Sequence, residues 1–551
     1  MWEGGSGVTR TYQDLVPTFP DRADWTLAQI LEKRSNETPG AVFLIAPEEG
    51  LRLTYGEIRS EAQSIATGIA ERGALAGDRV LIMAINSSAF VRTWLGTGIS
   101  GLVEVPINTA YEGEFLRHQV HVTTPRFAVI DDQFADRFVR LRQECSSIEH
   151  FWVIDKGNAQ ESIQQLRDAG WSASLWDKLL DFTPQVFPIP AAQDLASIFF
   201  TSGTTGPSKG VAMPHGQMYF FADEVVSLTR LTNTDTYMTV TPLFHGNAQF
   251  MAAYPALVAG AKLVIRSKFS ASRWVDQIRE EGVTVTNLIG VMMDFIWKQE
   301  PRANDSDNPL LCVFSAPTAS SILEVFKDRF GIEAFVEVFG LTETSAPILS
   351  PYGEDRPPGA AGLLASDFFD IRLVNPDTDE EVPVGEIGEL VIRPKFPWTC
   401  SLGYYGMADR TAEAWRNLWF HTGDALKRDE YGWYYFVDRY KDALRRRGEN
   451  ISSYEVEQAV LSHPAVTECA VIAIAAEAEA GEDEVMAVIV TNRVVDPEEI
   501  WDYCRGRIPE FAIPRFIRLV EALPRTPSEK IQKSVLRAEG ITETTLDRTN
   551  R

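Results

Sequence analysis

The chain has 551 residues, too many for a single hydrophobic core, so two or more domains are expected. Its composition, 45% hydrophobic and 23% charged, is that of a folded soluble protein. The formal net charge of −25 excludes a uniformly basic surface and argues against sequence-independent binding to nucleic-acid phosphates.

The cysteines are odd in number and show no CxxC spacing: Cys145, Cys312, Cys400, Cys469 and Cys504. We expect reduced, mostly buried thiols in a cytoplasmic protein rather than a disulfide framework or a zinc site. No basic segment followed by an apolar stretch opens the chain, and no run approaches the roughly 18 apolar residues of a membrane span. Neither a signal peptide nor a transmembrane helix is therefore expected.

Short β-rich runs alternate with helical patterns over the first two thirds of the chain. Amphipathic helices are predicted at Tyr55–Arg72 and Ser272–Glu280. Strands that interleave with helices in this way favour parallel α/β layers. The predicted buried strands are Val80–Ile85, Leu102–Ile107, Lys262–Ile265 and Cys312–Phe314.

The pattern changes in EVPVGEIGELVIRP, which begins at Glu381 and alternates apolar with turn residues, as a small twisted sheet or barrel would. Further on, a helix at Val456–Leu461 and a strand at Ala470–Ile474 fit a compact α+β domain of roughly 110 residues. The predicted fold class is α/β: a large N-terminal domain of layered α/β sheets with a small β-barrel-like subdomain, then a small mobile α+β domain. The predicted domains are residues 1–440 and 441–551.

A loop rich in glycine and hydroxyl residues, FTSGTTGPSKG, follows the predicted strand Leu195–Phe200, and apolar residues at helical spacing follow the loop. Its glycines let backbone N–H groups converge on one point, its hydroxyls add donors, and Lys209 adds a mobile positive charge. That combination suits an oligophosphate. The loop is not a Walker A motif, because Gly210 rather than Ser or Thr follows the lysine. A surface linker is the alternative interpretation.

Three further segments carry isolated charged residues. VFGLTETSAP contains Glu343, WFHTGD ends at Asp424, and LPRTPSEKIQK places Lys530 in a Pro-rich turn. Taken singly, each pattern also fits a helix cap, a turn or a solvated lysine.

The order and joint presence of SGTTGPSKG, FGLTE, HTGD, DRYKD and PRTPSEK resemble the adenylate-forming superfamily of acyl-CoA synthetases, peptide-synthetase adenylation domains and firefly luciferase. The resemblance extends from about Thr54 to Arg537. It implies an enzyme that uses ATP and Mg²⁺ to activate a carboxylate as an acyl-adenylate.

The resemblance also implies roles for individual residues. Glu343 matches the acid that holds Mg²⁺, and Thr342 contacts the α-phosphate; Asp424 and Arg439 match the ribose-binding pair. The remaining matches to ATP-binding positions are the loop residues Thr201, Ser202, Gly203, Thr204, Thr205 and Lys209, and the adenine walls Ser315, Ala316, Pro317, Phe339 and Gly340.

Lys530 matches the catalytic lysine that reaches both the attacking carboxylate and the α-phosphate. A carboxylate is already ionised at pH 7 and needs no general base, but the pentavalent phosphate needs positive charge nearby. Lys441 matches the hinge about which the small domain rotates, which would withdraw Lys530 before the second half-reaction.

The basic stretch RYKDALRRR and the following GENISSYEVE resemble acyl-CoA synthetases more than peptide-synthetase adenylation domains. A solvated basic face is the alternative. No carrier-protein domain follows before Arg551, which favours a ligase that uses coenzyme A. The expected CoA-binding residues are Arg445, Arg447, Gly448 and Glu449.

His245, in TPLFHGNAQ, matches a residue beside the carboxylate site, although a core histidine is the alternative. The expected acyl pocket is mainly apolar, which suits an alkyl or alicyclic acid. PLFHGNAQ and RRRGENIS look closest to the crotonobetaine/carnitine-CoA ligase-like branch. The pocket residues are His245, Asn247, Ile289, Gly290, Val291, Met292 and Leu341.

The favoured function is therefore an AMP-forming acid–thiol ligase that makes acyl-CoA from a carboxylic acid, ATP and coenzyme A. Two alternatives stay open: an adenylation enzyme that loads a carrier protein, and a degenerate nucleotide-binding relative without catalysis. Its partners would be small molecules, with no nucleic acid and no membrane span, and a homodimer is one option for its assembly.

Overall fold

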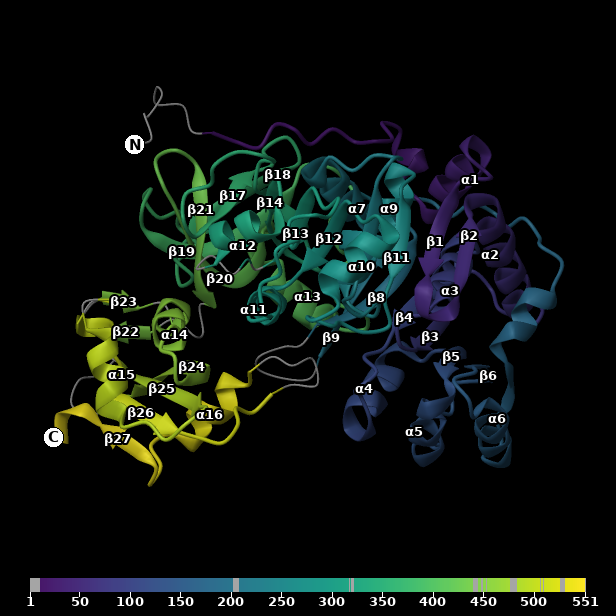
Figure 1. Ribbon diagram of the computed structural model, residues 1–551. Coiled ribbons are helices and arrows are strands. Elements are labelled where there is room, and N and C mark those ends of the chain that lie inside the picture. The colour runs from purple at the N-terminus through teal and green to yellow at the C-terminus, as the bar shows by residue number, and fades with distance from the viewer. Residues whose placement is uncertain are drawn as a thin grey trace.

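The protein is described by a computed structural model that contains two mainly parallel sheets, an antiparallel sheet and a smaller C-terminal unit (Figure 1). The described residues are 10–201, 208–316, 318, 322–439, 444–446, 449–451, 453–475, 483–505, 507–508, 510–525 and 531–550.

The first sheet has the strand order β7-β6-β5-β3-β4-β8-β9 and is parallel except for the final pair. It contains the expected strands near residues 80 and 102, and the predicted strand before the glycine-rich loop is β8. Its strands are β3 (Arg79–Met83), β4 (Val103–Pro106), β5 (Phe127–Asp131), β6 (His150–Ile154), β7 (Ser172–Leu175), β8 (Leu195–Thr201) and β9 (Lys209–Pro214).

The second sheet has the order β14-β13-β12-β10-β11-β1-β2, again parallel apart from its last pair. The two sheets confirm the predicted α/β layers, because the interleaved apolar runs are buried strands. The strands are β1 (Val42–Ala46), β2 (Leu51–Thr54), β10 (Thr236–Thr239), β11 (Lys262–Ile265), β12 (Val285–Leu288), β13 (Cys312–Ser315) and β14 (Ala334–Val336).

Helices cover both sheets, and one large apolar core joins them. Thr54 and Glu57 form a capping box that starts α2 where the sequence predicts a helix. The helices α3 and α7 are buried along almost their whole length, so each lies inside the core rather than at the surface. The helices of this part are α1 (Leu27–Glu37), α2 (Tyr55–Ala70), α3 (Ser88–Ile99), α4 (Gly113–Thr123), α5 (Ala135–Arg140), α6 (Ala159–Asp168), α7 (His215–Thr229), α8 (Gly246–Ala248), α9 (Tyr254–Ala259), α10 (Trp274–Glu281), α11 (Gly290–Trp297) and α12 (Leu323–Phe330).

The third sheet is antiparallel throughout, in the order β15-β16-β17-β21-β20-β19-β18. The alternating pattern that begins at Glu381 contains β19 of this sheet, but the sheet already starts at Val338 and is larger than that pattern predicts. The short helix α13 (Ala408–Ala414) precedes β20. The strands are β15 (Val338–Leu341), β16 (Ser345–Leu349), β17 (Ala360–Leu364), β18 (Phe369–Val374), β19 (Ile387–Pro394), β20 (Phe420–Arg428) and β21 (Trp433–Arg439).

The C-terminal unit, drawn in yellow and yellow-green in Figure 1, has hydrophobic clusters of its own. The predicted helix near Val456 and strand near Ala470 are both present. The boundary predicted after residue 440 falls outside the described residues and stays a prediction. The elements are β22 (Leu444–Arg446), β23 (Glu449–Ile451), α14 (Ser453–Leu461), β24 (Val466–Ala475), β25 (Asp483–Thr491), α15 (Pro497–Cys504), β26 (Phe516–Leu519), α16 (Lys533–Glu539) and β27 (Thr545–Asp547).

The N-terminal arm, residues 10–25, runs along the edge of the molecule from the third sheet to α1 (Figure 1). Thr18 donates two hydrogen bonds to Asp223 of α7, from its backbone N–H at 3.0 Å and from its hydroxyl at 2.5 Å. Burial raises the pKa of Asp223 to about 6, so these donors stabilise a carboxyl group that has little contact with water.

All five cysteines are free and buried, as predicted, and burial raises the pKa of the Cys504 thiol to about 11. Among the described helices, none is both long and apolar enough to cross a membrane.

Candidate active site

The stem of the glycine-rich loop is the antiparallel hairpin β8–β9. Thr201 and Lys209 are cross-strand partners, so the first and last residues of the predicted phosphate loop that the structure describes lie side by side. Position 210 favours glycine, because a Cβ there would lie 2.8 Å from a methyl group of Ile198. A ring nitrogen of His118, on α4, lies 2.8 Å from the backbone oxygen of Ser208 and adds a contact at the stem.

Glu343 lies in the tight turn between β15 and β16, as the FGLTE segment places it. The turn is closed by a 3.0 Å hydrogen bond from the backbone N–H of Thr344 to the carbonyl of Leu341, and Ser345 adopts a positive φ of 60°. Gly340 is required, since a Cβ there would lie 2.6 Å from the carbonyl oxygen of Ser345. In this turn Glu343 is only 9% exposed, so its carboxyl group lies close to the protein interior.

Helix α7, which follows the glycine-rich loop, supports the Glu343 turn from behind. Gln217 donates to the carbonyl of Thr342 at 2.8 Å, and Glu224 accepts from the backbone N–H of Ala346 at 3.1 Å. Burial holds the pKa of the Glu224 carboxyl well above its ordinary value, which disfavours a second negative charge beside Glu343.

Residues 399–405, which we call the bridging segment, lie between the Glu343 turn and β9. On one side, Ser401 donates its backbone N–H to the carbonyl of Glu343 at 2.8 Å. On the other, the backbone N–H of Leu402 donates to the carbonyl of Ala212 at 2.8 Å. The segment therefore joins the turn and the stem of the loop through backbone hydrogen bonds.

Tyr404 brings the two charged candidates together. Its hydroxyl donates to Glu343 Oε1 at 3.0 Å, and Lys209 Nζ lies 4.5 Å from the centre of its ring. Sequence patterns do not single out Tyr404, because nothing in SLGYYG distinguishes it from a core aromatic residue. Lys209 and Glu343, which the sequence does single out, thus contact the same side chain.

Asp424, Arg439, Phe339 and Gly340, which are expected around the nucleoside, all lie on strands of the third sheet. Asp424 of β20 and Arg439 of β21 are cross-strand partners, and the Asp424 side chain is buried. Phe339 of β15 stacks on Phe436 of β21, with ring centres 6.1 Å apart and an angle of 28° between the planes. These two pairs place the ribose and adenine candidates on the same sheet.

The segment after β13 lies beside the start of β15. Ser315 is buried at the end of β13, and Ala316 is half-buried. The backbone N–H of Thr318 donates to Glu337 at 3.4 Å, which holds this segment next to the residue that precedes β15.

Except for Leu341, the expected acyl-pocket residues lie in α8 and α11 or directly before these helices, next to β12. The short helix α8 begins after His245, and its Asn247 accepts hydrogen bonds from Asn287 of β12 at 2.5 Å and from Thr241 at 3.1 Å. Ile289 and Gly290 begin α11 directly after β12, with half-buried Met292 in its first turn. Asn247 thus fixes α8 to the sheet, a structural task that its pattern does not reveal.

A π-helical turn, Gln249–Ala253, continues α8, and such turns are frequent at functional sites. Gln249 donates to Glu104 Oε1 of β4 at 2.8 Å. Burial raises the pKa of Glu104 to about 8, so its carboxyl group is mostly protonated at neutral pH.

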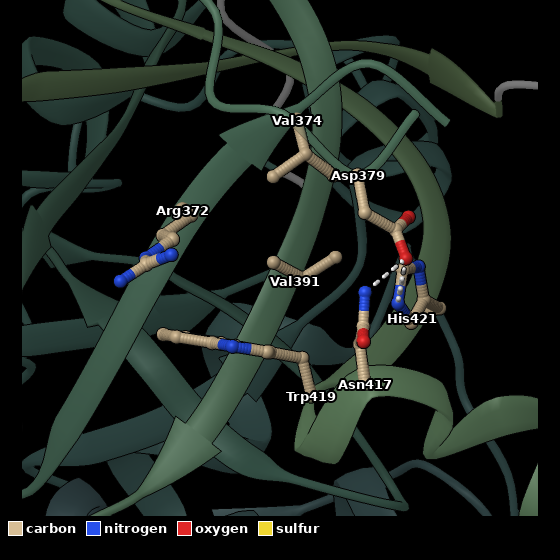
Figure 2. A pocket seen from close by; sticks show the side chains of 7 residues that line it. All are labelled: Arg372, Val374, Asp379, Val391, Asn417, Trp419 and His421. Atoms are coloured by element: carbon tan, nitrogen blue, oxygen red, sulfur yellow. Dashed lines mark hydrogen bonds and ion pairs between the residues drawn. The ribbon is translucent and has the colours of Figure 1, made fainter. Parts of the chain in front are cut away.

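A cavity of about 190 Å³ opens over β18, β19 and β20 (Figure 2). His421, from the HTGD motif, lines it and lies 3.0 Å from Glu389 through Nδ1. None of the residues lining this cavity is predicted for nucleotide or acyl binding, so it is separate from the candidate site. They are Arg372, Val374, Asp379, Val391, Asn417, Trp419 and His421.

The remaining predicted site residues fall into two groups: some lie in described strands and helices, and the others lie outside the described ranges. Arg445 lies in β22, and Glu449 begins β23, its antiparallel partner. Leu341 ends β15 beside the Glu343 turn, and Val291 lies in the first turn of α11. The predicted residues outside the described ranges are Ser202, Gly203, Thr204, Thr205, Pro317, Lys441, Arg447, Gly448 and Lys530.

Comparison with known proteins gives a consistent result. The family model "AMP-binding enzyme" matches residues 31–405, and "AMP-binding enzyme C-terminal domain" matches residues 455–530. The crotonobetaine/carnitine–CoA ligase of Salmonella paratyphi B is 31% identical over 550 residues, which cover 97% of this chain and 99% of the relative.

Two solved structures have the same fold over nearly the whole chain. The anthranilate CoA ligase AuaEII in complex with anthranoyl-AMP has a TM-score of 0.82 at 23% identity, covering 93% of this chain and 97% of its own. The O-succinylbenzoate coenzyme A synthetase of Bacillus subtilis, in complex with ATP and a magnesium ion, has a TM-score of 0.76 at 24% identity, covering 92% and 98%.

Proposed function

Because the chain belongs to the AMP-binding enzyme family, we propose that it is an ATP-dependent carboxylate–CoA ligase. It activates a carboxylic acid as acyl-AMP with release of pyrophosphate, and then transfers the acyl group to coenzyme A with release of AMP. The observation that carries this proposal is the approach of Lys209 and Glu343 to different parts of Tyr404, because a phosphate-binding cation and a metal-binding acid must act on one nucleotide.

The first half-reaction needs positive charge more than it needs a base. The attacking carboxylate is ionised at neutral pH, and negative charge grows on the α-phosphate as pyrophosphate leaves. In our proposal Lys209 binds the β- and γ-phosphates, Thr342 contacts the α-phosphate, and Lys530 contacts the α-phosphate and the carboxylate. Each cation stabilises the transition state more than the ground state.

Glu343 fits the role of a magnesium ligand. Mg²⁺ on a nucleotide is held by one or two carboxylates together with phosphate oxygens, rather than by a cage of protein ligands. The described residues agree with this, since they contain Glu343 at the turn but no cluster of three or more His, Cys, Asp or Glu that could hold a metal. When bound, Mg²⁺ would offset the negative charge of the phosphates.

The nucleoside would lie along the third sheet. The cross-strand pairing of Asp424 with Arg439 supports their assignment to the ribose hydroxyl groups, and we assign Phe339, Gly340 and the segment Ser315–Pro317 to the adenine. In this proposal the planar base and the ribose are held by residues at strand ends and turns, so nucleotide binding would require no large movement of the core.

The second half-reaction requires coenzyme A at the same acyl group. We place the domain boundary after residue 440, with Lys441 as the hinge, and assign the CoA phosphates to the basic stretch around Arg445 and Arg447. Rotation about the hinge would exchange Lys530 for the segment at Gly448 and Glu449. The name of the Salmonella relative, a CoA ligase, supports this choice of thiol.

The acid would bind between α8 and the first turn of α11, with its carboxylate near His245. The half-buried walls contributed by Ile289 and Met292 suit an apolar or alicyclic chain. The relative in Salmonella is named for crotonobetaine and carnitine, so zwitterionic acids belong in any substrate test.

A panel of short, medium, aromatic, alicyclic and zwitterionic acids tests the proposal. We expect at least one acid to give pyrophosphate release, with AMP release that depends on coenzyme A. Lys530→Ala should lower adenylate formation about 10²–10³-fold while sparing thioester formation from preformed acyl-adenylate. Adenylate that never reacts with coenzyme A would favour the carrier-loading alternative, and a protein that binds ATP without releasing pyrophosphate would favour the degenerate one.

A further inference from the structure

We propose that Tyr404 is a positioning residue that couples Mg²⁺ binding to ATP binding. It would do so by fixing Lys209 and Glu343 relative to each other, through its ring and its hydroxyl respectively. The inference rests on the proposed function, because it assumes that Lys209 binds phosphate and that Glu343 binds the metal.

The hydroxyl group of Tyr404 orients Glu343 without neutralising it. A phenol donates one hydrogen bond to one carboxylate oxygen, here Oε1 at 3.0 Å, and leaves the negative charge in place. A lysine or arginine in the same position would form an ion pair and weaken the attraction of the carboxylate for a cation. Tyrosine is therefore suited to hold an acid that must bind a metal.

The ring of Tyr404 serves Lys209. The ammonium group lies 4.5 Å from the ring centre, within the range of a cation–π interaction. A ring face attracts a cation without supplying a full negative charge, so the lysine keeps its charge for a phosphate. One side chain thus contacts both the cation and the acid, and it leaves each of them able to bind its own part of the nucleotide.

The backbone around Tyr404 explains why its position is fixed. Gly403 has a φ of 109°, and a Cβ there would lie 2.5 Å from a methyl group of Thr411. The backbone N–H of Tyr404 donates to the hydroxyl of Thr411 at 2.9 Å, while Tyr405 donates its N–H to the carbonyl of Gly210 at 2.7 Å. The ring is therefore attached through its backbone to α13 and to β9, the strand that carries Lys209.

Two variants separate the hydroxyl from the ring. Tyr404→Phe keeps the ring and loses the hydrogen bond to Glu343; Tyr404→Leu loses both. Isothermal titration calorimetry with ATP, in the presence and absence of Mg²⁺, measures how much the metal strengthens ATP binding. We expect Tyr404→Phe to reduce that gain about tenfold, the scale of a hydrogen bond to a charged group, and to leave metal-free ATP affinity unchanged.

Tyr404→Leu should show the same loss of the Mg²⁺-dependent gain. In addition, it should weaken metal-free ATP binding about threefold, because Lys209 no longer has the ring face. Raising the Mg²⁺ concentration should restore ATP binding in Tyr404→Phe and only partly in Tyr404→Leu. This split between the two variants is not expected from a residue that only fills space.

Tyr435→Phe is a matched control within the third sheet. Its hydroxyl donates to Asp429 at 2.9 Å and Lys427 lies 5.5 Å from its ring centre, so it has the same two kinds of partner at a place with no assigned ligand. We expect wild-type binding in both titrations. An unchanged Mg²⁺-dependent gain in Tyr404→Phe, or an equal loss in Tyr435→Phe, would overturn the inference. Failure of the wild-type protein to bind ATP would instead contradict the proposed function.

Discussion

The nucleotide side and the acyl side of the candidate site are built differently. On the nucleotide side, backbone hydrogen bonds from Ser401 and Leu402 attach the bridging segment to the Glu343 turn and to β9. On the acyl side, side-chain amides such as Asn247 and Gln249 hold a short helix and a π-helical turn. Backbone contacts hardly depend on side-chain identity, whereas side-chain contacts change with every substitution. The nucleotide side also uses the Gln217 and Glu224 side chains, but its backbone contacts make it less dependent on side-chain identity than the acyl side, in line with the fixed nucleotide site and adjustable acid pocket that we propose.

The strongest test of this comparison is Glu343→Gln. Glutamine can still accept the hydrogen bond from Tyr404 but has lost the charge that would bind Mg²⁺. We expect adenylate formation, measured by pyrophosphate release, to fall about 10²–10³-fold and by the same factor for every acid. Glu333→Gln is the control, because Glu333 also accepts from a tyrosine, Tyr352, at 3.3 Å but at an exposed place. A loss of adenylate formation that varies from one acid to another would contradict the separation of the nucleotide side from the acyl side.

Glu104→Gln concerns the acyl side, where Gln249 donates to this buried acid. The folded-state pKa of Glu104 is raised from 4.5 to about 8 by burial. Its contribution to stability is therefore complete below pH 4.5 and is lost as pH rises to about 8. Glutamine does not titrate, so the stability of the variant relative to wild type should rise between pH 5 and pH 8, by up to about 3 kcal/mol. A difference in Tm that does not change with pH would contradict this assignment.

Gly340→Ala tests whether the nucleotide side depends on backbone geometry. The added Cβ would lie 2.6 Å from the carbonyl oxygen of Ser345 and 2.9 Å from Ala346 Cα, neither of which can move freely. We expect a loss of roughly 2 kcal/mol in unfolding free energy and a fall of several degrees in Tm. Gly40→Ala provides the control, since nothing lies within 4 Å of a Cβ there. Equal Tm values for the two variants would refute the strain argument.

Met292→Ala gives the smallest expected effect and tests the acyl side. Removing a half-buried flexible side chain should change kcat/KM by about tenfold, in favour of bulkier acids. The KM for ATP should stay within about twofold of the wild-type value. A parallel change in the KM for ATP would mean that the two sides do not act independently.

Sequence patterns predict many of the helices, strands and candidate residues, but they do not predict the contacts between distant segments. Periodicity predicts α2 and the strand β8, and the FGLTE and HTGD segments single out Glu343 and Asp424 as candidates. Tyr404, Gln217 and Glu224 escape prediction because their roles consist of contacts between distant segments, and no local pattern encodes such contacts. Asn247 is expected as a pocket residue, yet its hydrogen bonds to β12 give it a structural role as well.

Asp223 and Glu224 are consecutive residues of α7, and each has a separate partner. Asp223 accepts hydrogen bonds from Thr18 in the N-terminal arm. Glu224 accepts a hydrogen bond from the backbone N–H of Ala346, directly after the turn that carries Glu343. Removing the chain up to and including Thr18 would take from the buried Asp223 carboxyl the two hydrogen bonds that Thr18 donates, one residue before Glu224. Shortened versions of the protein should therefore be checked for magnesium affinity as well as for yield, because a change at one end of the chain can reach the turn that carries Glu343.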